Sequence, residues 1–285
     1  MKIPRRVQKV WESLPTMEGA GVHLRRAFGF HEMPKLDPFL LLDSFRSENP
    51  EDYKRGFPWH PHRGIETITY ILDGDVDHQD SLGNGGTISL GDVQWMTAGS
   101  GIIHQEMPKG DGKGLMAGFQ LWANLPATAK MMAPRYREIK ERGIPLVKTS
   151  EGATVRVICG QVGAVQGPVK EIVIDPLFLD VSLPSGKIFT HPVKAGHTAF
   201  AYVIEGEGCF DPESGSAAAK ADHLVFYGPG NGVIVSTETR SVRFLLVSGS
   251  PIKEPVAWHG PIVMNTQEEL KIAFEEIQTG TFIKK

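Results

Sequence analysis

The chain has 285 residues, of which 41% are hydrophobic and 22% charged, with a formal net charge of −3 and a pI of about 6.4. This length suits one large domain or two of ordinary size, and the composition is that of a soluble globular protein. The charge gives no electrostatic reason to bind nucleic acid, and no window of the sequence is long and apolar enough to span a membrane. We therefore expect a protein that binds neither nucleic acid nor a membrane.

Two cysteines, Cys159 and Cys209, lie far apart in the sequence. They do not make a disulfide framework, and buried thiols in a reducing compartment are the simpler interpretation. The charged N-terminus is not followed by an apolar run, so it does not resemble a secretory signal. These features predict a cytoplasmic protein.

Short apolar runs, separated by frequent glycine and proline, are typical of an all-β protein. We expect strands at 67–72, 87–90, 93–96 and 115–122 in the first half, and at 155–159, 177–183, 199–204, 224–227, 232–235 and 242–247 in the second. The segment 67–74 resembles 200–206, because each is an apolar strand that ends in an acidic residue and a glycine. This repetition predicts two copies of one β-barrel.

Two segments have helical character. The first, 130–142, is polar, lacks strand alternation and precedes Gly143-Ile144-Pro145, so we expect it to be a short helical linker between the halves. The second begins with Thr266 and Glu269, which form a capping-box pattern, and ends at Gly280. Its apolar residues recur on one helical face, which predicts a C-terminal helix that docks on the protein.

Four residues of metal-ligand type form two pairs with the same spacing, His60 with His62 and His104 with Glu106. Residues i and i+2 of an extended strand point to the same face. Two such strands facing each other would bring three imidazoles and one carboxylate to a single point. This donor set suits a divalent transition metal, with Fe, Ni, Co, Cu, Mn and Zn all compatible. A single histidine on a strand would usually be an ordinary polar residue, but two matched pairs favour the metal site.

The two segments that carry these pairs extend into longer motifs. The first reads Gly56-Phe57-Pro58-Trp59-His60-Pro61-His62-Arg63-Gly64-Ile65-Glu66-Thr67, and the second runs from Gly91-Asp92-Val93-Gln94-Trp95 to Ile103-His104-Gln105-Glu106. Together they resemble the pirin family of cupin proteins. Further similarity lies in Leu36-Asp37-Pro38-Phe39-Leu40 and in Phe119-Gln120-Leu121-Trp122-Ala123-Asn124. The specific motifs cover about the first half of the chain.

This resemblance implies two tandem cupin domains, each a jelly-roll β-barrel. The N-terminal, metal-binding domain would span 1–134, the linker 135–145, and the C-terminal domain 146–285. The resemblance assigns the metal ligands to His60, His62, His104 and Glu106 and favours iron. Glu66 occupies a ligand position in many cupins, so its role stays open between a ligand and a supporting residue. We expect no metal in the C-terminal domain, where His191 and His197 are six residues apart.

The resemblance also implies an activity, the opening of flavonols such as quercetin by a metal-dependent dioxygenase. Its substrates would be a small planar aromatic molecule and O2, with Glu106 as the catalytic proton acceptor. Phe57, Trp59, Trp95 and Met96 are candidates for the pocket walls, although Trp95 and Met96 suit the barrel core equally well. Arg63 and Gln94 are candidates for hydrogen bonds to the ligands.

A second hypothesis follows from the same family. Some relatives resemble metal- or redox-dependent regulatory proteins that act on a transcription factor or a metabolic enzyme, and some animal relatives are nuclear. A cupin that acts on a sugar or a small acid, such as an isomerase, is a third, less favoured hypothesis. A roomy apolar pocket beside the metal would favour catalysis, and a closed pocket beside a charged surface would favour a protein partner. Because two barrels in one chain could satisfy each other, we expect a monomer.

Overall fold

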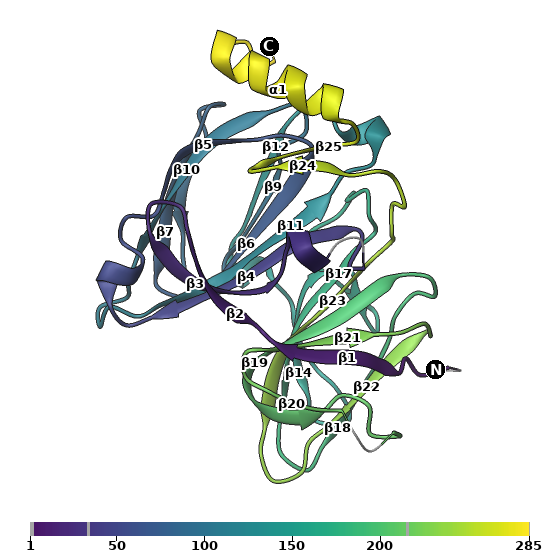
Figure 1. Ribbon diagram of the computed structural model, residues 1–285. Coiled ribbons are helices and arrows are strands. Elements are labelled where there is room, and N and C mark those ends of the chain that lie inside the picture. The colour runs from purple at the N-terminus through teal and green to yellow at the C-terminus, as the bar shows by residue number, and fades with distance from the viewer. Residues whose placement is uncertain (1–2, 33–34, 215–216, 285) are drawn as a thin grey trace. The chain divides into compact units, whose positions relative to one another are not determined.

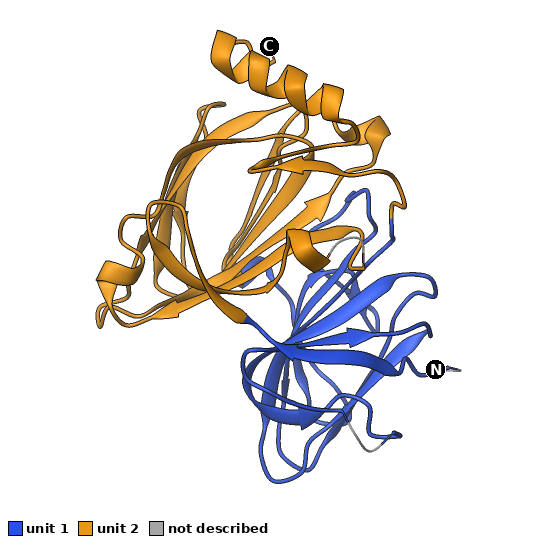
Figure 2. Ribbon diagram, viewed as in Figure 1, with its two compact units in different colours: residues 1–13, 142–251 blue, residues 14–141, 252–285 orange. Residues whose placement is uncertain are grey.

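The computed structural model describes residues 3–32, 35–214 and 217–284, which form β-strands and, in these ranges, one α-helix (Figure 1). The chain divides into two compact units (Figure 2). Unit 1 contains residues 1–13 and 142–251, and unit 2 contains residues 14–141 and 252–285. The fold is therefore all-β with a C-terminal helix, as expected.

Unit 2 contains two β-sheets that face each other in Figure 1. The larger sheet has seven strands in the order β12-β9-β6-β11-β4-β3-β2, and the smaller has four in the order β5-β10-β7-β8. The larger comprises β2 (Leu14–Glu18), β3 (Val22–Phe28), β4 (Phe39–Ser47), β6 (Ile65–Asp73), β9 (Val93–Thr97), β11 (Met116–Asn124) and β12 (Arg135–Ile139). The smaller comprises β5 (Phe57–His62), β7 (Asp75–Asp80), β8 (Gly85–Ile88) and β10 (Ile102–Lys109).

Strand β6 shows why the sequence forms this sandwich. Its residues are mostly β-branched or aromatic, which favours a strand, and nearly all of them are buried because the strand lies between β9 and β11. Thr67, Thr69 and Ile71 share one face, and Glu66 shares the other with Ile68. Thr69 contacts a residue of the smaller sheet, which identifies its face as the inner one.

The last residues of the chain complete unit 2. A hairpin of β24 (Ala257–His259) and β25 (Ile262–Met264) precedes α1 (Gln267–Thr279). The helix has the predicted capping box of Thr266 with Glu269, and Gly280 ends it in the left-handed conformation that glycine tolerates best. Leu270 and Ala273 pack with Phe282 and the hairpin residue Ile262, so the predicted docking helix is confirmed.

Unit 1 is a second β-structure with a ten-stranded sheet and a small hairpin of β15 and β16. Its apolar side chains, among them Val157, Leu179, Phe244 and Leu246, form one large core. The strands are β1 (Val7–Glu12), β13 (Leu146–Lys148), β14 (Thr154–Cys159), β15 (Gln161–Val162), β16 (Val165–Gln166), β17 (Leu177–Leu183), β18 (Ile188–Pro192), β19 (Thr198–Cys209), β20 (Ala218–Lys220), β21 (His223–Tyr227), β22 (Gly232–Ser236) and β23 (Val242–Gly249).

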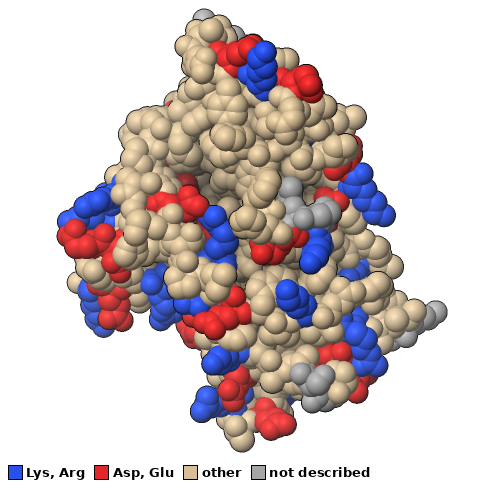
Figure 3. All heavy atoms as spheres, viewed as in Figure 1, with Lys and Arg blue, Asp and Glu red and all other residues tan. Residues whose placement is uncertain are grey.

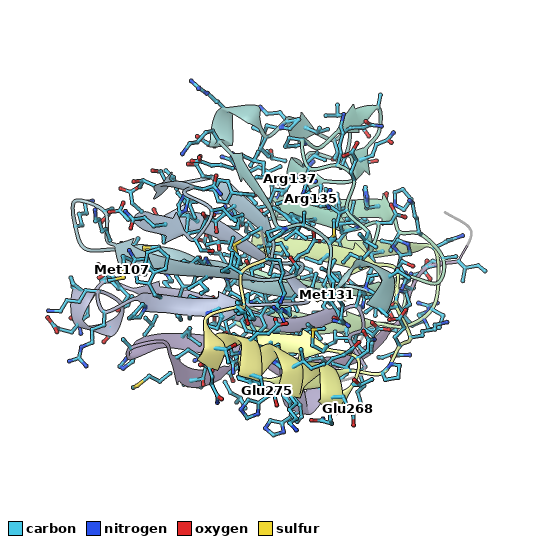
Figure 4. The ribbon with its side chains drawn as sticks, turned by 90° about the horizontal axis from the view of Figure 1, so that it is seen from above. Met107, Met131, Arg135, Arg137, Glu268 and Glu275 are labelled. Atoms are coloured by element: carbon cyan, nitrogen blue, oxygen red, sulfur yellow. The ribbon has the colours of Figure 1, made fainter. Side chains whose placement is uncertain are left out.

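The expected helix at 130–142 is wrong. Residues 135–139 form strand β12, which pairs with β9 from Arg135 opposite Thr97 to Ile139 opposite Val93. Figure 4 labels Arg135 and Arg137 of this strand. Pro134 precedes the strand and disfavours a helix through this point. The remaining helical pieces are short 3₁₀ turns at Phe30–Glu32, Pro50–Asp52, Ala127–Ala129 and Glu141–Gly143.

The division of the chain also differs from the expected one. The change from unit 2 to unit 1 at residues 141 and 142 falls inside the expected linker, but each end of the chain belongs to the unit formed by the other half. Strand β1 pairs with β21 of unit 1, whereas the β24–β25 hairpin belongs to unit 2. No local sequence signal predicts which unit each terminal segment joins, because this depends on pairing between residues far apart in the chain.

Charged side chains of both signs are interspersed on the face drawn in Figure 3. Among the described residues, no helix is long and apolar enough to cross a membrane.

Candidate metal centre

Three histidines come together between β5 and β10. His60 and His62 lie on β5, and His104 lies on β10, where it pairs directly with His60. One ring nitrogen of each lies within 4.8 Å of the others, and within the described residues this is the group of metal-ligand type that the structure brings together. The ring centroids of His60 and His104 are 4.4 Å apart. The i, i+2 spacing on β5 therefore places both histidines on the same face, as predicted.

The hydrogen bonds of these rings suit a bound cation. Nδ1 of His60 lies 2.8 Å from the carbonyl oxygen of Pro58, and Nδ1 of His62 lies 3.2 Å from that of Pro261. A carbonyl oxygen only accepts, so each Nδ1 carries the proton and each Nε2 keeps its lone pair. Nε2 of His104 is buried without a hydrogen-bond partner among the described residues. A metal ion would satisfy these atoms, so the residues present fit such an ion.

Burial also keeps the three rings in the form that binds metals. Desolvation lowers the pKa of His60 and lowers the pKa values of His62 and His104 well below their ordinary value. The neighbouring histidines act in the same direction for His62 and His104, because several positive charges in one small space repel each other. The neutral imidazole is the ligand form, so the site is prepared for a cation at neutral pH.

Glu106 lies near this group but outside it. It follows His104 by two residues on β10, shares its face, and lines the same cavity as His60 and His62. Its carboxylate accepts a hydrogen bond from the Thr69 hydroxyl over 3.1 Å. Burial raises the pKa of Glu106 to about 7, against the hydrogen bond from Thr69, which lowers it. The assignment of Glu106 as fourth ligand stays a prediction.

The Thr69 hydroxyl has two acceptors within reach, because Oε1 of Gln120 lies 2.7 Å from its oxygen. A hydroxyl has one proton and cannot donate to both. Either the Gln120 amide is turned so that its nitrogen donates to Thr69, or Glu106 is protonated and donates to Thr69 itself. The hydrogen bonds among Glu106, Thr69 and Gln120 are therefore compatible with either a protonated or a deprotonated Glu106 carboxyl.

A cavity of about 770 Å³ opens beside these residues in unit 2. Its lining includes His60, His62 and Glu106, the polar side chains of Thr69, Gln120, Arg26 and Asp43, and the aromatic side chains of Phe30, Phe45, Tyr53, Phe57, Trp122 and Trp258. The volume lies within the range of about 300–1,000 Å³ that is usual for small-molecule sites. Aromatic walls with a few polar groups suit a flat organic molecule.

Of the four predicted wall residues, Phe57 lines the cavity. Trp59 is 52% exposed. Trp95 is buried on the outer face of β9, where it pairs with Ile68. Met96 belongs to an apolar cluster with Leu40 and Ile102. The wall prediction is therefore wrong for Trp59, whereas for Trp95 and Met96 the alternative of the barrel core is confirmed. Strand alternation fixes the face of a residue but not its depth. The other aromatic wall residues, Phe30, Phe45, Tyr53, Trp122 and Trp258, come from distant parts of the chain and had no local signal.

Glu66 takes a structural position. It lies on the face of β6 opposite Thr69, fully buried, and accepts a hydrogen bond from the Thr97 hydroxyl over 2.6 Å. Burial raises the pKa of its carboxyl, whereas Thr97, Trp95 and the charges of Arg135 and Arg137 lower it. Strand geometry therefore separates Glu66 from the three histidines, so that of the two predicted acids only Glu106 lines the cavity beside His60 and His62.

Other sequence expectations need correction. The buried guanidinium of Arg63 donates to Ser100 O, to Glu276 and to Phe282 O, so it fixes the C-terminal segment and not a ligand. Gln94 donates to Tyr136 over 3.4 Å. His78 is buried on β7 opposite Glu106, with its Nε2 2.7 Å from the Tyr136 hydroxyl.

In unit 1, His191 is buried on β18 with its ring stacked on Phe189, and His197 lies 3.6 Å from Asp175. Neither histidine belongs to the three-residue group of unit 2. The Cys159 thiol lies 3.4 Å from the carbonyl oxygens of Val169 and Pro176, and Cys209 is a free cysteine.

Comparison with known proteins agrees with the fold and the site. The family model described as Pirin matches residues 21–123, and the model of the Pirin C-terminal cupin domain matches residues 178–283. A pirin-like protein of Caulobacter vibrioides is 45% identical over 279 residues, which cover 98% of this chain and 99% of that protein. Human pirin is 40% identical over 92% of this chain and 89% of its own length.

Solved structures extend this similarity. The crystal structure of a quercetin 2,3-dioxygenase from Acinetobacter baumannii is 31% identical, with a TM-score of 0.88 and 98% of both chains covered. A bacterial pirin of Escherichia coli, solved in complex with nickel(II), shares the fold with a TM-score of 0.64 and 19% identity over 85% of this chain and 99% of its own. Fold, site geometry and sequence agree that the chain belongs to the pirin family and contains two cupin domains.

Proposed function

We propose that this protein is a metal-dependent dioxygenase that opens the ring of flavonols such as quercetin with O2. The observation that supports this most is the cavity of about 770 Å³, which joins aromatic walls to the histidine group and Glu106. A protein that only presented a surface to a partner would not need such a space beside the metal. The relatives named as quercetin dioxygenases suggest the substrate class.

His60, His62 and His104 would hold the ion, with Glu106 as the proposed fourth ligand. When bound, a divalent transition metal, for which we propose iron, supplies Lewis acidity that lowers the pKa of a nearby hydroxyl and redox chemistry with dioxygen. This donor set also suits Ni, Co, Cu, Mn or Zn, and the oxygen-consuming reaction is the reason to prefer a redox-active ion.

The chain's own residues would orient the substrate and move its proton. Phe45, Phe57 and Trp122 line the cavity and would hold flat rings by stacking and edge contacts. Nε1 of Trp122 is buried without a hydrogen-bond partner among the described residues, so it can donate to a substrate oxygen. Glu106 would accept the proton of the substrate hydroxyl, and Thr69 with Gln120 would stabilise either charge state.

Oxygen-dependent cleavage of a flavonol by the iron-loaded protein tests this proposal. The protein is loaded with Fe(II) without oxygen, its metal content is measured, and quercetin and then air are added while the flavonol absorbance and O2 consumption are followed. We expect ring-cleaved product from the wild type and none from His62→Gln, with His223→Gln of unit 1 as the matched control. An iron-loaded wild type that binds quercetin but consumes no O2 would reject the dioxygenase assignment.

A further inference from the structure

The β24–β25 hairpin forms part of the cavity wall although it comes from the end of the chain. Trp258, His259, Gly260 and Pro261 all line the cavity of unit 2. The hairpin lies nearly two hundred residues after the histidines of β5 in the sequence, so no local motif connects the two. Its contacts show whether the hairpin only closes one side of the cavity or also orients the proposed metal ligands.

One contact reaches a proposed metal ligand directly. The carbonyl oxygen of Pro261 lies 3.2 Å from Nδ1 of His62 and accepts a hydrogen bond from its N–H. The corresponding acceptor for His60 is Pro58, two residues away on the same strand. His60 is therefore oriented by its own strand, whereas His62 depends on the hairpin for its tautomer and ring direction.

Hydrogen bonds fix the hairpin next to the residue that follows His62. The N–H of Val263 donates to the carbonyl of Arg63, which is the residue after His62. Arg63 in turn donates to Glu276 over 2.6 Å and to the carbonyl of Phe282 over 2.9 Å. Its guanidinium lies 4.2 Å from the Phe282 ring centroid, a cation–π contact. The C-terminal helix and its tail thus fix the hairpin to the strand that carries the ligands.

A second contact shapes the space for a ligand. The ring of Trp258 lies 5.6 Å from Phe30 and 6.0 Å from Trp122, and Trp122 lies 5.1 Å from His62. The Trp258 indole donates to Gly260 O over 2.7 Å, which fixes the indole relative to the turn. An aromatic row therefore runs from the hairpin to the histidine group along the cavity.

We propose that the hairpin is a working part of the candidate metal centre. Pro261 is a positioning residue, because its carbonyl holds His62 in the tautomer that offers Nε2 to the ion. Trp258 is a specificity-determining residue that selects a planar aromatic ligand by ring contact. The role of Trp258 rests on the proposed function, whereas the role of Pro261 requires only that the histidines bind a metal.

The Pro261 role is tested by Co(II) titration of Pro261→Gly, which leaves a carbonyl at position 261 but removes the rigidity that holds it. Loss of an outer hydrogen bond typically lowers metal affinity by about 10–100-fold, and we expect a loss in this range. In ¹⁵N spectra of the metal-free protein, His62 should change from the Nδ1–H form to a mixture of tautomers. Pro255→Gly is the control, because this exposed proline precedes the hairpin.

Several outcomes overturn the Pro261 role. These are a Co(II) affinity of Pro261→Gly within about twofold of the wild type, an unchanged His62 tautomer, or a wild type that binds no Co(II). Thermal unfolding of each variant shows whether the protein is folded. If Pro261→Gly does not fold, both measurements are made on Pro261→Ala. Alanine lacks the proline ring but keeps a Cβ atom, which restricts the backbone more than glycine does.

The Trp258 role is tested by quercetin binding rather than turnover, measured by fluorescence titration of Trp258→Ala. We expect about tenfold weaker quercetin binding with unchanged Co(II) affinity, since the variant loses the ring contact and the apolar area that the indole covers. Trp59→Ala is the control, because Trp59 is exposed and does not line the cavity. Equal losses in both variants, or no binding by the wild type, overturn this role. Absence of ring cleavage with the Pro261 effect intact rejects the dioxygenase alone.

Discussion

The hydroxyl of Thr69 lies 3.1 Å from the carboxylate of Glu106 and joins the inner faces of the two sheets of unit 2. This bond orients the carboxylate of Glu106, which shares a face of β10 with His104. Because Glu106 is buried, a nearby donor decides both where its carboxylate points and how readily it accepts a proton.

Removal of this donor should reduce catalysis more than stability. In Thr69→Val we expect flavonol turnover to fall by about tenfold or more. General acid–base catalysis contributes about 10²–10⁴-fold, and this variant loses the hydrogen bond that orients the Glu106 carboxylate. The matched control is Thr67→Val, two residues earlier on the same face. The Thr67 hydroxyl is buried without a partner among the described residues, so its removal should be neutral or stabilising. Steady-state kinetics and urea unfolding check both, and equal turnover in the two variants would contradict this role.

Metal binding should stabilise the protein through the three histidines. At a free metal concentration of 100 times Kd, the free energy of unfolding should rise by about 2.7 kcal/mol. Differential scanning calorimetry with and without the metal should show this rise for the wild type and none for His104→Gln. The control is His23→Gln, whose ring is half exposed and faces Asp52. A metal-dependent rise that persists in His104→Gln would place the ion elsewhere.

Loss of the carboxylate charge should change the metal affinity differently at Glu66 and at Glu106. In Glu66→Gln we expect the metal affinity to change by no more than about twofold, because Glu66 lies on the outer face and keeps its bond with Thr97. In Glu106→Gln we expect a loss of about tenfold or more, as for a group that binds or orients a ligand. Calorimetric titration measures both affinities. The opposite ranking would return Glu66 to the ligand set.

Lys130 should be a major contributor to the stability of unit 2. Its buried Nζ donates to Gly64 O, Asn124 Oδ1 and Val263 O over 2.7–2.9 Å. Lys130→Met keeps the length of the side chain but removes these hydrogen bonds, at a cost of about 1–3 kcal/mol for each buried acceptor that finds no other donor. Asn124 Oδ1 still accepts from the Leu125 N–H over 3.0 Å. Urea unfolding should show a large loss for Lys130→Met and about 0.5 kcal/mol or less for the exposed Lys271→Met on α1. Figure 4 labels Glu275, the partner of Lys271 on this exposed face.

His191 should make unit 1 sensitive to acid. Desolvation lowers its pKa from 6.5 to about 4 in the folded protein. Between these values the unfolded chain binds more protons than the folded one, so stability falls as the pH falls from 6.5 toward 4. The loss at pH 4 is about 3 kcal/mol, since each pKa unit corresponds to about 1.4 kcal/mol. Unfolding of unit 1 at several pH values should show a weaker acid dependence in His191→Leu, and a wild-type dependence in His223→Leu.

The sequence predicted the strands and the histidine pairs because both depend on local spacing. His60 and His62 share a face whenever the segment is extended, and the residues around them favour that state. The C-terminal helix was equally local, since its cap and its end each lie within a few residues of the helix itself. The residues at 135–139 were mistaken for helix because an edge strand such as β12 can carry polar side chains and shows little alternation of burial.

The surroundings of the histidines could not be predicted in this way. Pro261 and Trp258 reach the site through tertiary pairing, and backbone carbonyls such as that of Pro261 have no residue-type signature. The choice between Glu66 and Glu106 was open because both acids follow a histidine closely in the sequence. It required knowing that β6 turns Glu66 outward while β10 keeps Glu106 on the inner face.

The split of unit 2 into two chain segments has a consequence for synthesis. A ribosome makes residues 14–141 before residues 142–251, so it completes unit 1 before the hairpin and α1 emerge. During that interval the nascent β5 and β10 can pair, but the carbonyl of residue 261 is not yet present to accept the hydrogen bond from His62 Nδ1. A gene fragment that stops at residue 141 would lack this carbonyl, so we expect it to bind the proposed metal ion more weakly than the full chain.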